Sequence, residues 1–176
     1  MKRYLIPILA ILVLASIILL GCSQTTVHNN HKYGYSVEAP NDWIIEGGKK
    51  EGDTVCYGAV GGRPTLNIIV SVDITPMTGS QELDRVVKEQ VDKEGIFFSI
   101  SDYYELKDTK LIENHYQLEG RRLAHNVIQW FRTDFVLHNN LLYEVTYTSV
   151  DTPGDSRNRR ELDKVHIYVD GYGKVR

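Results

Sequence analysis

The stretch YGYSVEAPNDW, Tyr33 to Trp43, alternates apolar residues with small or polar ones, a period that is typical of a half-buried β-strand. Pro40 has no backbone N–H and ends this strand, and the next two residues, Asn41 and Asp42, favour a turn. Trp43 begins a further extended run. The sequence therefore predicts that the fold begins with a strand, a tight turn and a second strand.

Two more strands and a helix are predicted directly after this stretch. The runs TVCYGAV (Thr54–Val60) and TLNIIVSVDIT (Thr65–Thr75) flank a turn, and apolar residues fill alternate positions of the longer run. Such alternation indicates a sheet with one covered face. The segment Ser80–Gly95 has apolar residues at helical spacing, beginning with Leu83, and charged residues opposite them. We expect this amphipathic helix to pack on the sheet.

The second half of the chain, from Ile96 to Val150, predicts a β-meander in an antiparallel sheet. Its strand-like runs are joined at Glu113-Asn114, His125-Asn126 and His138-Asn139-Asn140. The last of these turns is the clearest hairpin signal in the chain. After Pro153 the apolar residues return to helical spacing, which predicts a second helix that extends to Val169 and holds His166 as a packing residue.

The pattern at the start of the fold, together with the order of elements, resembles the PsbP-like family, which shares its fold with Mog1 and the DcrB-type lipoproteins. The matching residues are Tyr35, Ser36, Val37, Pro40 and Trp43, with a weaker match in the strand Tyr143–Tyr147. The resemblance covers about Tyr33 to Tyr168. It implies an α+β fold, namely an α/β/α sandwich around a twisted antiparallel sheet. It also implies a binding or assembly role, and it transfers no catalytic residue.

The leader indicates where the protein is located. A basic start at Lys2 and Arg3 precedes an apolar run from Tyr4 to Leu20, a pattern that is typical of a signal peptide. Leu19-Leu20-Gly21-Cys22 resembles the lipobox of bacterial lipoproteins, which implies cleavage before Cys22 and lipidation of its thiol. An uncleaved membrane helix is the alternative, since the run is close to the length that spans a bilayer.

Three regions follow from this interpretation: a signal peptide at 1–21, the lipidated Cys22 with a polar tether at 22–31, and an α+β domain at 32–176. The lipid is expected to anchor the protein to the outer face of the cytoplasmic membrane, or to the outer membrane in a two-membrane cell. Without Lys2 and Arg3 the formal charge falls from −3 to −5, which does not favour a nucleic-acid partner.

Candidate chemical groups are few. Cys56 is the only thiol besides Cys22, and we interpret it as a small apolar residue on a strand. The sequence has none of the common nucleophile, metalloprotease or phosphate-loop motifs. His28 and His31 lie in the predicted tether, where a metal site would lack preorganisation. The sequence therefore predicts no enzyme activity, no cofactor and no metal site.

Three further groups of residues are candidates for contacts. Arginines at two places in the chain can form a basic patch, and histidines near the meander turns can meet a carboxylate; solvated arginines and chance neighbours are the alternatives. The arginines are Arg121, Arg122, Arg157, Arg159 and Arg160; the histidines are His115, His125 and His138, with Glu113 or Asp134 as the carboxylate. Tyr103, Tyr104 and Tyr172 are candidates for exposed tyrosines that contact a partner, and cross-strand pairing on the sheet is the favoured alternative. We therefore expect a non-catalytic protein-binding or accessory module whose partner is unknown. The alternative is a lipoprotein that binds a small molecule or a metal.

Overall fold

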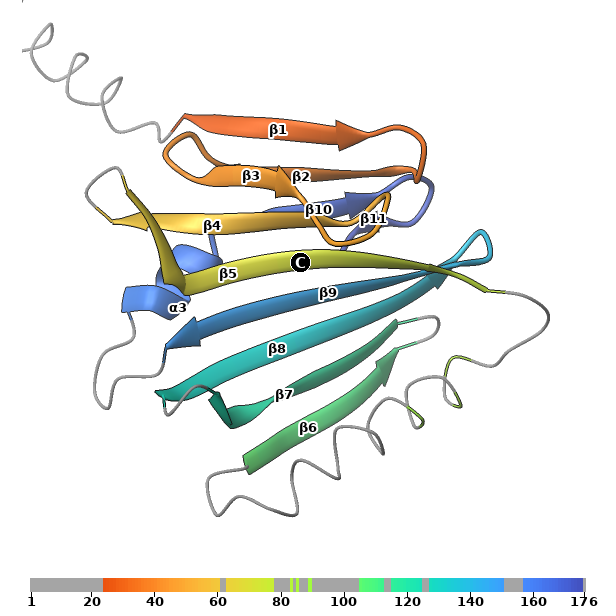
Figure 1. Cartoon of the computed structure of the whole chain (residues 1–176). Coiled ribbons are helices and arrows are strands. Elements are labelled where there is room, and N and C mark those ends of the chain that lie inside the picture. The colour runs from red at the N-terminus through yellow and green to blue at the C-terminus, as the bar shows by residue number, and fades with distance from the viewer. Residues whose placement is uncertain are drawn as a thin grey trace, which may run out of the picture.

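Antiparallel strands in two sheets make up most of the fold in a computed structural model, which describes residues 24–60, 63–77, 83, 85, 89, 105–112, 115–124, 127–150 and 157–175 (Figure 1). The small sheet has the order β1-β2-β10-β11, and the large sheet has the order β3-β4-β5-β9-β8-β7-β6. The elements are β1 (Thr25–Asn30), β2 (Tyr35–Pro40), β3 (Ile44–Gly47), β4 (Thr54–Val60), β5 (Arg63–Pro76), β6 (Glu105–Ile112), β7 (His115–Ala124), β8 (Val127–His138), β9 (Leu141–Val150), α3 (Arg157–Leu162), β10 (His166–Val169) and β11 (Gly173–Lys174).

The stretch Tyr33–Trp43 connects the two sheets. Tyr35, Val37 and Ala39 are buried on one face of β2, as the alternation predicts. The backbone N–H of Trp43 donates to the carbonyl of Pro40 at 2.9 Å and closes the turn. The strand after this turn, β3, pairs with β4 in the large sheet and not with β2. Both predicted strands are confirmed, and the turn between them is a corner where the chain passes from one sheet to the other.

The polar tract before Tyr33 is a strand, so the predicted tether is wrong for Thr25–Asn30. β1 pairs with β2 over its full length, and the Thr26 hydroxyl donates to Asn41 Oδ1 at 2.6 Å. Periodicity could not reveal this strand, because β1 is an edge strand whose side chains are exposed on both faces; even Val27 is 54% exposed. Its stability comes from backbone pairing rather than from burial of an apolar face.

The main hydrophobic core lies between the two sheets. One face of β5 supplies Ile68, Val70, Val72 and Ile74, which confirms the predicted one-sided burial of the β4–β5 hairpin. The small sheet and α3 cover this face with the following residues: Tyr35, Val37, Ala39, Leu162, Val165, Ile167 and Val169. The sheets thus bury each other's apolar faces, which is the main stabilising contribution in such a packing.

A second hydrophobic cluster lies on the opposite face of the large sheet. It consists of Leu83, Leu118, Phe131, Phe135 and Leu142. Within the predicted helix Ser80–Gly95 the structure describes Leu83, Arg85 and Glu89, and all three are helical. Leu83 packs on the sheet as expected; the other positions of this predicted helix lie outside the described residues.

The predicted β-meander is confirmed as β6 to β9, with β8 between β7 and β9. Asn139 and Asn140 have φ values of 51° and 60°. Positive φ at both central residues is the geometry of a two-residue hairpin turn that matches the twist of the strands, and asparagine tolerates it. The hairpin signal in the sequence is therefore explained by the backbone.

The predicted second helix is wrong beyond Leu162. α3 has 6 residues, and His166–Val169 is the strand β10, which pairs with β2. Val165, Ile167 and Val169 are buried with a period of two, whereas His166 is half-buried. Val165 and Val169 fit a helical spacing with Leu162, but Val165, Ile167 and Val169 also alternate as in a strand, and pairing with β2 favours the strand.

Candidate binding surface

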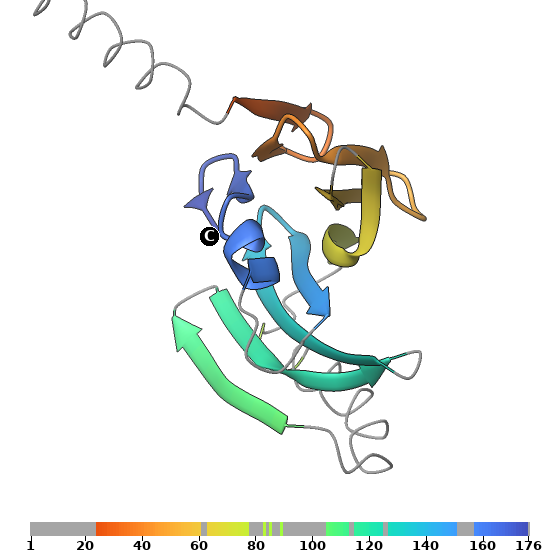
Figure 2. The same cartoon turned by 90° about the vertical axis from the view of Figure 1, so that its left-hand side faces the viewer.

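Charged and polar side chains gather on one face of β7 and β8. The two strands pair so that Gln117 lies opposite Asp134, Glu119 opposite Arg132, and Arg121 opposite Trp130. We call the following residues the β7–β8 polar surface: His115, Gln117, Glu119, Arg121, Trp130, Arg132 and Asp134. This face is on the same side of the sheet as the main core, since Trp130 belongs to that core. In Figure 2, β6 to β8 curve away from the small sheet below α3.

Asp134 is the centre of this surface. Its side chain has 0% exposure, and four nitrogen atoms lie within hydrogen-bond distance of its carboxylate. His115 Nε2 is 2.8 Å and Gln117 Nε2 2.9 Å from Oδ1, while Arg132 donates from Nε at 2.8 Å and from Nη2 at 3.0 Å. Burial alone would raise the pKa of Asp134, but the hydrogen bonds from His115 and Arg132 hold that pKa below its usual value.

Arg132 is held between Asp134 and an aromatic ring. Its guanidinium carbon lies 6.0 Å from the ring centroid of Tyr147, and its side chain is 20% exposed. A guanidinium that is fixed by two hydrogen bonds and a ring face has lost most of its conformational freedom before any partner arrives. Arg132 therefore presents a preorganised donor at the surface.

Trp130 links the surface to α3. Its indole N–H donates to Glu119 Oε1 at 2.8 Å, and the guanidinium carbon of Arg159 lies 5.1 Å from the ring centroid. Only 7% of Trp130 is exposed. The ring is therefore fixed on both sides, by a carboxylate of β7 and by a cation of α3.

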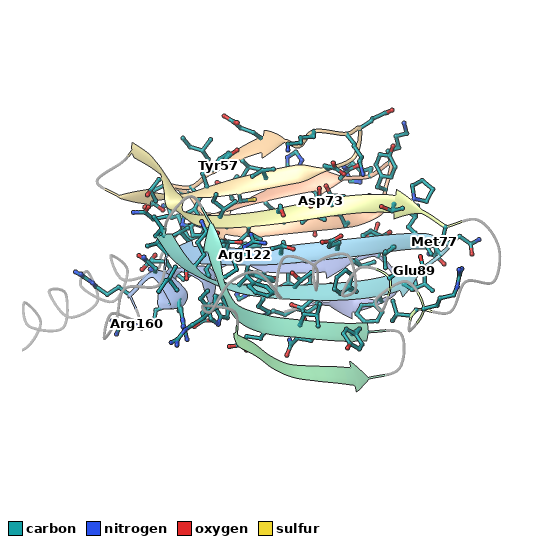
Figure 3. All side chains as sticks on the ribbon, turned by 60° about the horizontal axis from the view of Figure 1, so that its bottom comes forward. Tyr57, Asp73, Met77, Glu89, Arg122 and Arg160 are labelled. Atoms are coloured by element: carbon teal, nitrogen blue, oxygen red, sulfur yellow. The ribbon has the colours of Figure 1, made fainter. Side chains whose placement is uncertain are left out.

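The five arginines of the predicted basic patch do not form one cluster. Arg121 is exposed beside Trp130, and Arg159 stacks on the same ring. Arg122 projects from the other face of β7, where its guanidinium carbon lies 5.4 Å from the ring centroid of Phe131 (Figure 3). Consecutive residues of a strand point to opposite faces, so Arg121 and Arg122 could not have shared a surface.

Of the histidine–carboxylate contacts that the sequence left open, the structure contains the one between His115 and Asp134. The ring of Tyr172 lies edge-on between two histidines, with centroids 6.4 Å from His115 and 6.2 Å from His138. Four of the residues named in the sequence for these contacts lie outside the described residues: Glu113, His125, Tyr103 and Tyr104. His115 and Tyr172 thus extend the surface toward the turn that follows β8.

The other candidate groups from the sequence are a possible nucleophile, Cys56, and possible metal ligands. Cys56 is fully buried, and burial raises the pKa of its thiol to about 12, which leaves it without nucleophilic thiolate at neutral pH. In the part of the chain that the structure describes, no group of three or more His, Cys, Asp or Glu residues is placed to hold a metal ion. Among the described helices, none is long and apolar enough to cross a membrane. Cys22 lies outside the described residues, so its lipidation stays a prediction.

This arrangement is suited to recognition of another protein. Trp and Arg are among the residue types that dominate binding energy at protein interfaces, and here Trp130 and Arg132 are fixed by hydrogen bonds to Glu119 and Asp134. The sequence analysis did not identify the roles of Gln117, Glu119 and Trp130. The available signal was Arg132 and Asp134 two residues apart on one face of a strand that is otherwise apolar.

Comparison with known proteins identifies the fold. Neither protein-family models nor curated protein sequences match the chain. Among solved structures, the fold is similar to cyanobacterial PsbP (CyanoP) from Synechocystis sp. PCC 6803, at 16% identity and a TM-score of 0.57 over 85% of this chain and 95% of that one. It is also similar to the Ran-binding protein Mog1p of Saccharomyces cerevisiae, at 7% identity and a TM-score of 0.54 over 82% of this chain and 95% of that one.

A third similar structure is LpqN of Mycobacterium tuberculosis, which is involved in cell envelope biogenesis. The identity is 11% and the TM-score 0.50, over 85% of this chain and 90% of that one. The chain thus has a PsbP/Mog1-like fold, and the resemblance inferred from Tyr35 to Trp43 is confirmed at the level of the fold.

Proposed function

We propose that this protein is a lipid-anchored accessory module of the cell envelope, which binds a protein partner through the β7–β8 polar surface and has no catalytic activity. The observation that carries the proposal is the fixed position of Arg132 and Trp130, each held by a carboxylate and a ring contact. Similar structures support it: Mog1p is a Ran-binding protein, and LpqN is involved in cell envelope biogenesis.

The charges of the surface favour a protein partner of mixed polarity. Across the two strands, acidic and basic residues alternate, with Arg121 exposed, Glu119 and Arg132 half-buried and Asp134 fully buried. A surface of one sign would favour a polyanion or a polycation, whereas alternating charges select a partner by the position of each group. The exposed edge of this pattern is where a partner gains the first contacts.

The hydrogen bonds around Asp134 support the non-catalytic part of the proposal. His115 lies against a carboxylate that also binds Gln117 and Arg132. Such a carboxylate is fully engaged and stabilises a fixed arrangement of side chains.

The proposal also includes the α/β/α arrangement, because Leu162 of α3 and the helical residue Leu83 pack on opposite faces of the large sheet.

The test is co-purification from membranes. We expect the tagged, crosslinked wild-type protein to recover one partner in near-stoichiometric amount, and the variant Arg121→Glu to recover several-fold less because it reverses the exposed charge beside Trp130. Lys49→Glu makes the same charge change at an exposed residue outside the surface and serves as the control. Equal recovery with all three proteins would contradict the proposed surface. Recovery of nothing specific would favour the alternative of a lipoprotein that binds a small molecule or a metal.

A further inference from the structure

The length of chain between the proposed lipid and the folded domain limits how the domain is oriented. Gln24 is fixed to the turn after β2: its carbonyl accepts from the N–H of Asn41 at 3.0 Å, and its side-chain oxygen accepts from Asn41 Nδ2 at 3.1 Å. Thr26 makes a further hydrogen bond to the same asparagine. Since Ser23 alone separates Gln24 from Cys22, the two Cα atoms at 22 and 24 are at most about 7 Å apart.

We propose that the end of the fold where β1 begins, with Gln24, Asn41 and Asp42, rests directly on the lipid head groups, and that the opposite end faces away from the membrane. The inference depends on the lipidation of Cys22 proposed above. When one residue joins the lipidated cysteine to the fold, the end of the fold that carries Gln24 stays at the surface of the bilayer. The connection is too short for that end to move away from the lipid.

The two ends of β1 mark the end of the fold that is proposed to face the membrane and the end that is proposed to face away from it. At its far end, Asn30 donates to the carbonyl of Gly52 at 3.1 Å, so the loop between β3 and β4 lies there. Six residues of strand separate the two ends by about 20 Å. Asp42 is exposed at the proposed lipid-facing end, and Glu51 is exposed in the distant loop, where it pairs with Lys32.

Net charge does not explain this orientation. α3 lies at the same side of the molecule as the start of β1 (Figure 1), and it exposes Arg157 and Arg160, of which Arg160 is seen at the periphery in Figure 3. These arginines can donate to lipid phosphates. However, Asp42 and Asp163 are exposed at the same end, so the charge there is mixed. The proposed contact follows from the short connection, and we expect it to persist at high salt.

Thiol labelling in vesicles tests the orientation. The mature lipoprotein, purified as Asp42→Cys or as Glu51→Cys, is reconstituted into vesicles of phosphatidylcholine and phosphatidylglycerol and treated with a bulky polyethylene-glycol maleimide. Cys56 does not react with the maleimide because it is fully buried, and an acylated Cys22 has no free thiol. We expect position 42 to react several-fold more slowly than position 51.

A lengthened connection is the matched control. Ten Gly and Ser residues inserted between Ser23 and Gln24 add a mean span of about 17 Å and leave the domain unchanged. This insertion should bring the rate at position 42 up to the rate at position 51. Equal rates without the insertion, in a protein whose mass shows the lipid, would overturn the orientation and leave the anchor intact. Labelling of Cys22 in the unmodified sequence would overturn the anchor, and the orientation with it.

Discussion

Asp134→Asn is expected to lower the free energy of unfolding at neutral pH by about 3 kcal/mol, because it removes one partner of a buried ion pair and leaves Arg132 and His115 without their carboxylate. Asparagine keeps the volume of the side chain and one acceptor oxygen. The loss is therefore mainly electrostatic and not a cavity effect. Urea unfolding followed by tryptophan fluorescence measures it, since Trp130 lies on the same surface.

The effect of Asp134→Asn depends on pH in a defined direction. The pKa of Asp134 is depressed in the folded protein, so its contribution is fully present above the pKa of the unfolded chain and is lost as pH falls through the folded value. The variant should thus approach the wild type in stability in strong acid. Asp42→Asn, at an exposed turn position, should change the stability by a few tenths of a kcal/mol at most. A similar loss in both variants would show that the Asp134 network does not stabilise the fold.

Cys22→Ser is expected to abolish membrane attachment. Two or more acyl chains, at about 0.8 kcal/mol for each buried methylene group, hold a protein on a bilayer durably, and serine cannot carry the thioether-linked lipid. Fractionation of cells and the intact mass of the protein measure the two consequences, loss from membranes and loss of the lipid mass.

Cys56→Ser is the control for that change. Cys56 is buried in the core, so serine there lowers stability by placing a hydroxyl among apolar side chains, but it leaves the lipid in place. The lipoprotein interpretation fails if the wild type and Cys22→Ser both remain in membranes with the full-length mass, because the leader would then be an uncleaved membrane helix.

The sequence predicted those parts of the fold in which burial leaves a periodic trace. β2, β5 and the β8–β9 hairpin each bury one face or need special turn residues, and all three were expected from their residues. β1 and β10 were not. β1 is exposed on both faces and has no periodicity to detect, while β10 is four residues long, too short for its period to be separated from that of a helix.

The candidate surface was less accessible to sequence reasoning than the fold. A contact between His115 and Asp134 is one of several that the sequence leaves open, because histidines lie near the turns of the predicted meander. The packing of Arg159 on Trp130 joins α3 to β8. The two residues are 29 positions apart in the sequence, and no strand pairing or helical spacing predicts that they meet. Contacts of this kind depend on how the short helix settles on the sheet, which local sequence patterns do not encode.

Site-specific photocrosslinking in living cells is the most direct test of the account. A benzophenone amino acid at position 121, on the β7–β8 polar surface, should give one discrete crosslinked product, and the same group at position 49 should give none. Mass spectrometry of that product identifies the partner. If position 121 gives no product, or if positions 121 and 49 give the same pattern, the β7–β8 polar surface is not where this protein meets a partner.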